Sequence, residues 1–268
     1  MLMRQPMGSI YLLLLTFILS ASVFSQSPYK CSWTKDGIIF GTSLATGVTA
    51  LTVDNLPKPV TPGEINGLSR LSISRFDRGA TYKFSANLDE ASNAVVGISI
   101  TAPIVLLLDR SMRKDWKTIT VMYIETMTIS VSLPSLGKGA AKRIRPFVYN
   151  PDVPLEKKTT AEARKSFFSR HTTLAFASAV FISTVYSSYH PQSDWKPYIW
   201  AGSLLGAGCV GYLRYESGSH FPTDIITGGL IGGAIGYLIP LLHQISDETL
   251  SVYPSIGQSP GVSMQIKF

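Results

Sequence analysis

Three groups of polar residues in the second half of the chain have the types and spacing needed to bind an oxyanion. Lys138 is followed after six residues by Arg145, and Arg214 is followed after five residues by His220. Between these two groups in the sequence lies the remaining one, Ser-Arg-His at 169–171. A phosphoryl group in transfer spreads negative charge over its oxygens, so its site needs several fixed cations and amide donors around one point. These side chains could supply that environment.

His220 and Asp224 are four residues apart, which on one helical turn lets the carboxylate reach the imidazole. Such a contact fixes the tautomer of the ring and stabilises the cation that forms on it. Arg145 and Arg214 suit bidentate phosphate contacts, whereas Lys138 acts as a point charge. No carboxylate cluster surrounds these residues in the sequence, so we expect neither a metal ion nor another cofactor.

The order and spacing of these groups resemble the three motifs of the type 2 phosphatidic acid phosphatase (PAP2) and vanadium haloperoxidase superfamily. Those motifs are KxxxxxxRP, SGH and RxxxxxHxxxD, and the resemblance covers residues 138–242, about two fifths of the chain. It implies that His220 attacks phosphorus to form a phosphohistidine, and that His171 protonates the leaving alkoxide and later activates water. We expect Asp224 to orient His220, and the substrate phosphate to be bound by Lys138, Arg145, Arg214, Ser169 and Arg170.

One position departs from the family pattern, because Arg170 replaces the glycine of the second motif. Glycine there would let the backbone approach the phosphate closely. Arg170 could instead add a fourth cation, or it could block the pocket and weaken turnover. The second outcome would leave a phospholipid-binding relative with impaired catalysis, and this alternative stays open.

Six apolar segments without strand-like alternation are the predicted helices that position these groups. They span residues 38–53, 94–108, 119–133, 171–189, 198–213 and 224–242. Closely spaced glycines in the last two segments would let helix backbones approach each other, which favours a bundle embedded in lipid. The predicted fold class is therefore all-α, a bundle of about six helices with the active site at the ends of the last four. A soluble all-α core is the alternative, since each segment is marginal in length for a membrane span.

Glu125 lies inside the third of these apolar segments. A carboxylate is costly in lipid and is usually paired there, so it could be functional. A structural hydrogen bond to a neighbouring helix explains it equally well.

The composition narrows the class of protein. Of the 268 residues, 45% are hydrophobic and 15% are charged, which excludes a disordered or low-complexity chain. The 24 Lys and Arg against 17 Asp and Glu leave a net charge of +7, which suits a phosphorylated substrate or an anionic membrane surface. Two cysteines and four histidines at no recognised spacing argue against a structural zinc domain. Together with the motifs, this composition leads us to expect a phosphorylated lipid and a membrane as partners, and no nucleic acid. The oligomeric state stays open.

The chain divides into four predicted regions. Residues 1–25 have the pattern of a secretory signal peptide, with an uncleaved anchor as the rival interpretation. An N-terminal helical region (36–133), a PAP2-type catalytic region (134–243) and an irregular C-terminal tail (244–268) follow. The positive-inside rule places the basic loop 109–117 in the cytoplasm and the next polar loop, 134–170, outside. This orientation also puts the residues before Ile38 in the cytoplasm, which conflicts with a cleaved signal.

The function implied by the resemblance is a metal-independent phosphatase acting on a lipid-linked phosphate monoester or diphosphate through a phosphohistidine. Phosphatidate, phosphatidylglycerol phosphate, lipid A phosphate and polyprenyl diphosphate all fit the resemblance. The expected location is the cell envelope, either in the membrane with the active site facing the periplasm or exported to the periplasm. A soluble periplasmic non-specific acid phosphatase and a vanadate-dependent haloperoxidase are the alternative enzymes.

Overall fold

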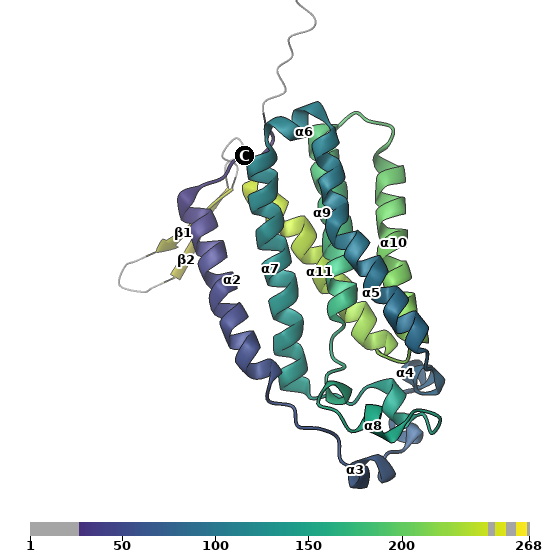
Figure 1. Ribbon diagram of the computed structural model, residues 1–268. Coiled ribbons are helices and arrows are strands. Elements are labelled where there is room, and N and C mark those ends of the chain that lie inside the picture. Colours follow the sequence, from purple (N-terminus) through teal and green to yellow (C-terminus); the bar gives the residue numbers. More distant parts are fainter. Residues whose placement is uncertain (1–26, 246–249, 256–260, 267–268) are drawn as a thin grey trace, which may run out of the picture.

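In the part of the chain that the structure describes, six long helices form one bundle (Figure 1). The computed structural model describes residues 27–245 and the backbone of residues 250–255 and 261–266, so the predicted signal peptide lies outside the described residues. The long helices are α2 (Trp33–Asp54), α5 (Ala86–Thr101), α7 (Trp116–Ala141), α9 (Arg170–Tyr189), α10 (Lys196–Glu216) and α11 (Pro222–His243). Each coincides with one predicted segment, although the second segment is divided between α5 and a 3₁₀ helix, η3 (Ala102–Leu108). The all-α fold class is confirmed.

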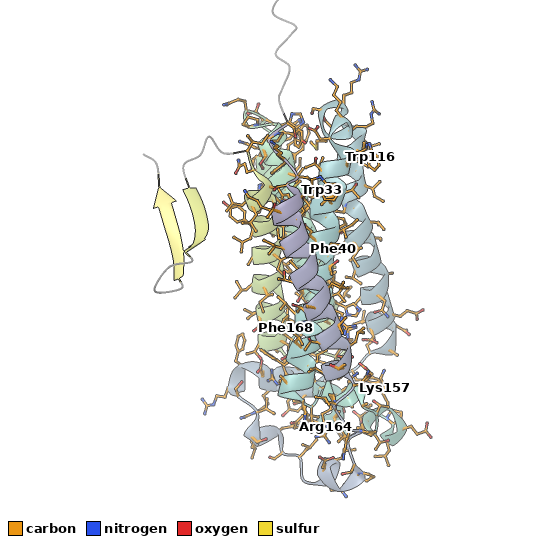
Figure 2. The ribbon with its side chains drawn as sticks, turned by 90° about the vertical axis from the view of Figure 1, so that its left-hand side faces the viewer. Trp33, Phe40, Trp116, Lys157, Arg164 and Phe168 are labelled. Carbon is orange, nitrogen blue, oxygen red and sulfur yellow. The ribbon has the colours of Figure 1, made fainter. Side chains whose placement is uncertain are left out.

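Short helices connect the long ones at the two ends of the bundle. One end carries α3 (Pro62–Asn66), η1 (Arg70–Ser72), α4 (Arg75–Arg78), η2 (Gly79–Tyr82), η4 (Pro146–Tyr149), α8 (Leu155–Lys158) and η5 (Glu162–Arg164). The other end carries α6 (Arg110–Lys114). Figure 2 shows Trp33 and Trp116 toward the α6 end, with Lys157 and Arg164 at the opposite end. The start of α2 therefore lies at the same end as the basic loop 109–117.

The C-terminal tail contains regular structure where the sequence predicts none. Strand β1 (Leu250–Ser255) pairs antiparallel with β2 (Gly261–Ile266), which places Val252 opposite Met264. Both strands contain β-branched residues, which favour extended backbone. Figure 2 shows the hairpin standing apart from the helices, so it takes no part in positioning the site.

Local sequence sets the helix ends near the predicted site. The Ser85 hydroxyl accepts the N–H of Leu88 and caps α5, and the Ser169 hydroxyl accepts the N–H of Thr172 and caps α9. Helix α7 ends at Lys142, whose φ of 47° is left-handed and stops the helical ladder. These ends leave the predicted motif residues at or beside helix termini.

Helices α9 and α11 run parallel and touch backbone to backbone through glycines of α11. A Cβ atom on Gly228 would lie 2.7 Å from the Ser169 carbonyl oxygen, and one on Gly232 would overlap the carbonyl oxygen of Thr173. Residues four apart share one helix face, so these glycines form a continuous seam against α9. The seam holds the N-terminus of α11 beside the N-terminus of α9.

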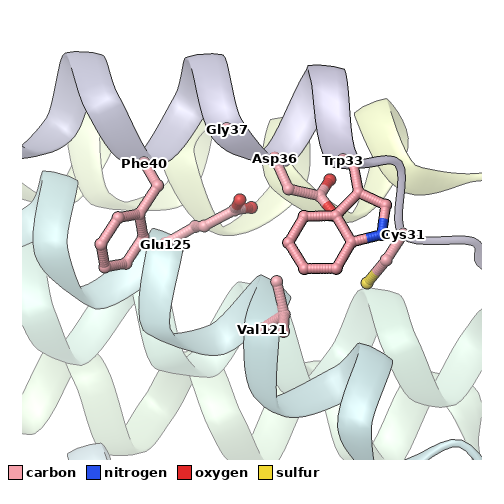
Figure 3. Close-up of a pocket in the computed structure, with 7 residues that line it drawn as sticks. All are labelled: Cys31, Trp33, Asp36, Gly37, Phe40, Val121 and Glu125. Carbon is pink, nitrogen blue, oxygen red and sulfur yellow. The ribbon is translucent and has the colours of Figure 1, made fainter.

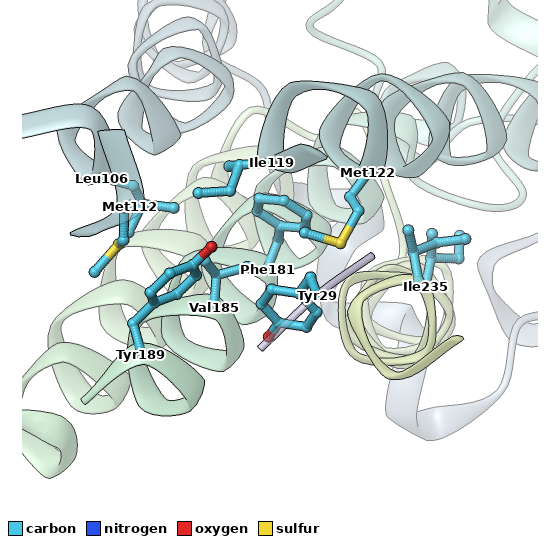
Figure 4. Packing of buried hydrophobic residues seen from close by; sticks show 10 residues of the cluster. Tyr29, Leu106, Met112, Ile119, Met122, Phe181, Val185, Tyr189 and Ile235 are labelled. Atoms are coloured by element: carbon cyan, nitrogen blue, oxygen red, sulfur yellow. The ribbon is translucent and has the colours of Figure 1, made fainter. Parts of the chain in front are cut away.

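The largest apolar cluster lies toward the α6 end (Figure 4). Its side chains come from the N-terminal segment, η3 and α6 and from three long helices, α7, α9 and α11: Tyr29, Leu106, Met112, Ile119, Met122, Phe181, Val185, Tyr189, Ile235 and Ile239. Burial of such side chains contributes about 1.5–3 kcal/mol each to folding. The cluster therefore fixes the bundle at the end away from the predicted site.

The outer surface of the bundle is strongly apolar. Ile98, Leu205 and Leu230 have 68%, 74% and 71% of their surface exposed, respectively. Four segments are long and apolar enough to cross a membrane, by length and composition: Trp33–Asp54, Ala86–Leu108, Trp116–Tyr149 and Pro222–His243. Apolar surface of this extent indicates contact with lipid rather than water. The protein is accordingly an integral membrane protein with four candidate spans.

Candidate active site

The three motif groups meet at the end of the bundle where α9 and α11 begin. The N–H of Ser169 donates to the carbonyl oxygen of Asp224 (3.1 Å), and the N–H of His220 donates to the carbonyl oxygen of Arg214 (3.2 Å). Lys138 lies in the last turn of α7, and Arg145 follows that helix after a short loop. Residues that are far apart in the sequence are thus brought to one place, next to two helix N-termini, whose free N–H groups favour anions.

His220 is buried in the loop just before α11, with 1% of its surface exposed. Burial, and then the positive charges of Arg214 and Arg145, hold the pKa of His220 well below its ordinary value. The imidazole is therefore neutral at pH 7. In that state one ring nitrogen carries the lone pair that a nucleophile needs.

The contact between His220 and Asp224 is longer than a hydrogen bond. Nδ1 of His220 lies 3.7 Å from Oδ2 of Asp224 and has no hydrogen-bond partner among the described residues. The pair does not share a helical turn as predicted, because α11 begins two residues after His220. Asp224 is held by other donors: Oδ2 accepts from the Ser166 hydroxyl (2.5 Å) and the Phe221 N–H (3.0 Å), and Oδ1 pairs with Arg143 (2.5 Å). The carboxylate is fixed beside the imidazole, within a small movement of it.

Several buried cationic donors at this end of the bundle lack partners. The Nε atoms of Arg145 and Arg214 are buried and make no hydrogen bond to any residue in the described ranges. Lys138 is 5% exposed and forms no hydrogen bond or ion pair within those ranges. Buried unsatisfied donors are rare, and each costs about 1–3 kcal/mol. A bound oxyanion would satisfy them.

Arg214 is held in place from α5. Its Nη1 donates to Asp89 (2.7 Å) and to Ser92 (3.0 Å), and it is 3% exposed. Asp89 also accepts from the hydroxyl of Ser219 (2.7 Å), the residue before His220. The Asp89 carboxylate therefore positions both the Arg214 guanidinium and the segment that carries His220.

Changing Asp89 to asparagine should weaken the site without unfolding the protein. The amide cannot neutralise Arg214, so we expect kcat/KM for phosphate release to fall roughly 10- to 100-fold, the range for losing an outer partner of a functional group. The matched control is Glu90→Gln on the exposed neighbouring residue, which should keep wild-type kinetics. Equal kinetics for the two variants would refute the positioning role of Asp89.

The second motif group opens α9. Ser169 is fully buried, and its oxygen accepts hydrogen bonds from the N–H and the hydroxyl of Thr172, so it serves as the helix cap. Nε2 of His171 lies 2.7 Å from Oδ1 of Asn93 on α5. Asn93 is one helical turn after Asp89, so one face of α5 contacts residues of both the second and the third motif groups. Sequence analysis did not single out either residue.

Arg170, the residue that departs from the family pattern, contacts α7 and the end of α2 through its side chain. Its Nη2 donates to the hydroxyl of Ser135 (2.8 Å) and lies 3.7 Å from a carboxylate oxygen of Asp54 at the end of α2. Ser135 is one turn before Lys138 on α7. The guanidinium is therefore held against α7 and α2, one helical turn from Lys138.

Arg143 and Asp77 are further site residues that sequence analysis missed. Arg143 lies 2.5 Å from Asp224 and 2.8 Å from Asp77, while Asp77 accepts from the N–H (3.0 Å) and the hydroxyl (2.8 Å) of Thr223. Together they brace the first turn of α11. In the sequence, only the position of Arg143 between Lys138 and Arg145 could have pointed to a role in the site. No feature of the sequence marks Asp77.

Comparison with known proteins agrees with this geometry. The family model described as the PAP2 superfamily matches residues 95–247, which is more than half the chain and includes all three motif groups. The chain belongs to the PAP2 superfamily. The resemblance drawn from the motifs is thereby confirmed.

Two curated proteins are similar to this PAP2 chain over part of their length. It is 28% identical over 152 residues to an undecaprenyl-diphosphatase of Sulfolobus acidocaldarius, covering 56% of this chain and 65% of that protein. It is 26% identical over 160 residues to a probable diacylglycerol pyrophosphate phosphatase 1 of Schizosaccharomyces pombe, covering 49% of this chain and 57% of that protein. The chain thus spans less than two thirds of the length of either relative.

Two crystal structures are also similar to this PAP2 chain. One is a transmembrane PAP2-type phosphatidylglycerolphosphate phosphatase from Bacillus subtilis, with 18% identity, a TM-score of 0.47, and coverage of 79% of this chain and 96% of that one. The other is Aquifex aeolicus LpxE, with 23% identity, a TM-score of 0.36, and coverage of 58% and 86%.

Proposed function

We propose that this PAP2 protein is a phosphatase that hydrolyses a lipid-linked phosphate monoester or diphosphate through a phosphohistidine at His220. One observation carries the proposal: the unpartnered N–H groups of Arg145 and Arg214 are buried together with a neutral, buried His220. A tetrahedral oxyanion matches that combination of fixed positive charge and an uncharged nucleophile. Lys138 supplies a third charge from α7.

The proposed reaction assigns these residues the roles that the family resemblance implies, in two steps. First, Nε2 of His220 forms a bond to phosphorus while the bond from phosphorus to the leaving oxygen breaks, and protonated His171 gives that oxygen its proton. Burial and the positive charge of Arg214 lower the pKa of His171 to about 3, so the ring takes up this proton only when the negative phosphate is bound beside it. Asp224 stabilises the charge on the imidazole by accepting from Nδ1–H. Then His171 takes a proton from water, the water oxygen bonds to phosphorus, and the bond from phosphorus to Nε2 breaks. Phosphate leaves and His220 is neutral again.

The substrate class is argued from the surroundings of the site. The site lies at one end of a bundle whose outer surface is apolar, so an acyl or prenyl chain could stay in lipid while its phosphate enters between the helix ends. The names of both curated relatives describe lipid diphosphates as substrates. A lipid-linked phosphate is thus favoured over a water-soluble one.

The test is release of inorganic phosphate by the full chain, purified in detergent and assayed in EDTA. Diacylglycerol pyrophosphate, undecaprenyl diphosphate and a short-chain phosphatidate serve as lipid substrates, and a soluble aryl phosphate serves as the comparison. We expect at least one lipid substrate to be hydrolysed with a higher kcat/KM than the aryl phosphate. Hydrolysis of the aryl phosphate alone would favour a broad acid phosphatase, and no hydrolysis would end the proposal.

The site is proposed to face away from the cytoplasm. The basic loop at α6 lies at the opposite end of the bundle from the site, and basic loops stay on the cytoplasmic side. In a variant without native cysteines, a cysteine replacing exposed Glu156 at the site end should react with an impermeant maleimide in intact cells. A cysteine replacing exposed Arg113 should react only after permeabilisation. The reverse pattern would show that the site faces the cytoplasm.

A further inference from the structure

Three titratable side chains from three helices meet at the end of the bundle opposite the candidate active site. They are Asp36 on α2, Glu125 on α7 and His243 at the end of α11. One donor atom from each lies within 4.8 Å of the other two. Nε2 of His243 is 3.0 Å from Asp36 Oδ1 and 3.4 Å from Glu125 Oε2. Helix α11 rises roughly 28 Å between Asp224 and His243, so this cluster is separate from the phosphate site.

A backbone carbonyl group one helical turn away sets the tautomer of His243. Its Nδ1–H donates to the carbonyl oxygen of Ile239 at 2.9 Å, and a carbonyl oxygen can only accept. In the neutral ring, Nε2 therefore turns a lone pair toward the two carboxylates. Histidines that bind metal ions usually donate their other N–H to a carbonyl or carboxylate in this way. Lone pairs facing one point repel each other unless a proton or a metal cation lies between them.

Glu125 lacks the donors that a buried carboxylate needs. It is 1% exposed, and neither of its oxygens accepts a hydrogen bond from any residue in the described part of the chain. A proton on His243 would balance only one of the two carboxylates, and without a metal ion the second would have to take up a proton of its own or remain as a costly negative charge in an apolar bundle. A divalent cation bound to a neutral histidine would balance both.

A cavity of about 480 Å³ adjoins the cluster. It is lined by Cys31, Trp33, Asp36, Gly37, Phe40, Val121 and Glu125, and Figure 3 shows the carboxylates of Asp36 and Glu125 between the ribbons of α2 and α7. The cavity gives an ion a route to the carboxylates of Asp36 and Glu125, which His243 contacts from α11. It also leaves room for a further ligand, such as water, on the open side.

We propose that Asp36, Glu125 and His243 bind one divalent transition-metal ion, best matched by Zn²⁺, which clamps α2 to α7 and α11. One imidazole and two carboxylates suit Zn²⁺, whereas Ca²⁺ and Mg²⁺ favour oxygen ligands alone. Donors at Zn²⁺ bond lengths lie about 3.3 Å apart in a tetrahedral site, close to the two distances from Nε2. The sequence could not reveal this site, because its three residues are far apart along the chain. The inference is independent of the phosphatase activity.

The test measures metal binding by the full chain purified in detergent. The protein is stripped with EDTA, dialysed against Zn²⁺ and then against buffer, and its metal content is measured by mass spectrometry. We expect about one Zn²⁺ per chain in the wild type. Glu125→Gln and His243→Gln should bind Zn²⁺ at least about tenfold more weakly in competition with a chromophoric chelator. The matched controls, Glu90→Gln and His190→Gln, should bind like the wild type.

Thermal unfolding gives a second readout that activity does not affect. Zn²⁺ should raise the Tm of the wild type and of both controls but not that of Glu125→Gln, because only a complete site joins the three helices. If Glu125→Gln does not fold, Asp36→Asn replaces it, since the Asp36 side chain is 18% exposed and tolerates an amide better. A wild type that retains no Zn²⁺, or variants that bind Zn²⁺ as tightly as the wild type, would overturn the proposal in favour of an ion pair with protonated His243. Phosphate release should persist in EDTA at temperatures below the Tm, because the phosphatase reaction does not use this metal ion. A failure of the phosphatase proposal is therefore distinguishable from a failure of the Zn²⁺ proposal.

Discussion

Replacing His220 with alanine should abolish phosphate release, lowering kcat by at least about 10⁴-fold. Without the imidazole, no group remains to form the bond to phosphorus, and the buried cations alone can only bind the substrate. Substrate affinity should change far less than kcat, because Arg145, Arg214 and Lys138 are untouched. Phosphate release from a short-chain lipid phosphate, measured over a range of substrate concentrations, separates the two effects.

His190→Ala is the matched control for this loss. His190 lies at the other end of the bundle, where its Nε2 is 3.2 Å from Asp109. This variant removes an equally large ring without touching the site, so its kcat should stay within about twofold of the wild type. If His220→Ala kept comparable activity, the nucleophile would have to be another residue.

Among the substitutions of a glycine by alanine in α11, Gly232→Ala should cause the largest loss of stability. The new Cβ would overlap the carbonyl oxygen of Thr173, which is backbone of a buried helix and cannot rotate away. Forced separation of α9 and α11 costs about 1–3 kcal/mol, which corresponds to a Tm lower by roughly 2–12 °C for a bundle of this size. Thermal unfolding of the purified protein in detergent measures the change.

The neighbouring glycine gives the control for the Gly232 variant. A Cβ on Gly233 would meet its nearest atom, a methyl carbon of Val180, at 3.7 Å, which is ordinary contact. Alanine there also has the higher helix propensity, by up to about 1 kcal/mol, so the Tm of Gly233→Ala should be unchanged or raised. Similar losses in both variants would mean that the glycines matter for helix flexibility rather than for the seam between α9 and α11.

The six long helices could be predicted because each buries or exposes a continuous apolar run. The exact start of α5 could not, and the reason is informative. Its first half carries Asp89 and Asn93, and the apolar criterion that found residues 94–108 excludes these polar positions. Pro103 then ends the regular α-helix, because it has no N–H to donate. The half of α5 that the sequence pattern misses is the half that contacts the site.

The site itself was predictable only where its residues follow one another at fixed spacing. Lys138, Arg145, Arg214 and His220 belong to short motifs, so their grouping could be inferred before the fold was known. Asp77 contributes through tertiary contacts alone, and no local pattern marks it. The same reason hid the cluster at the opposite end of the bundle, whose members are about 90 residues or more apart along the chain.

The most direct test of the central claim is to trap the covalent intermediate. The full chain is mixed with a radiolabelled lipid phosphate, quenched within the first turnovers and digested, and the labelled peptide is identified by mass spectrometry. The account predicts a phosphoryl group on His220 that is lost in acid, survives alkali and is absent from His220→Ala. Label on a different residue, or rapid hydrolysis with no protein-bound phosphate under any quench, would contradict it.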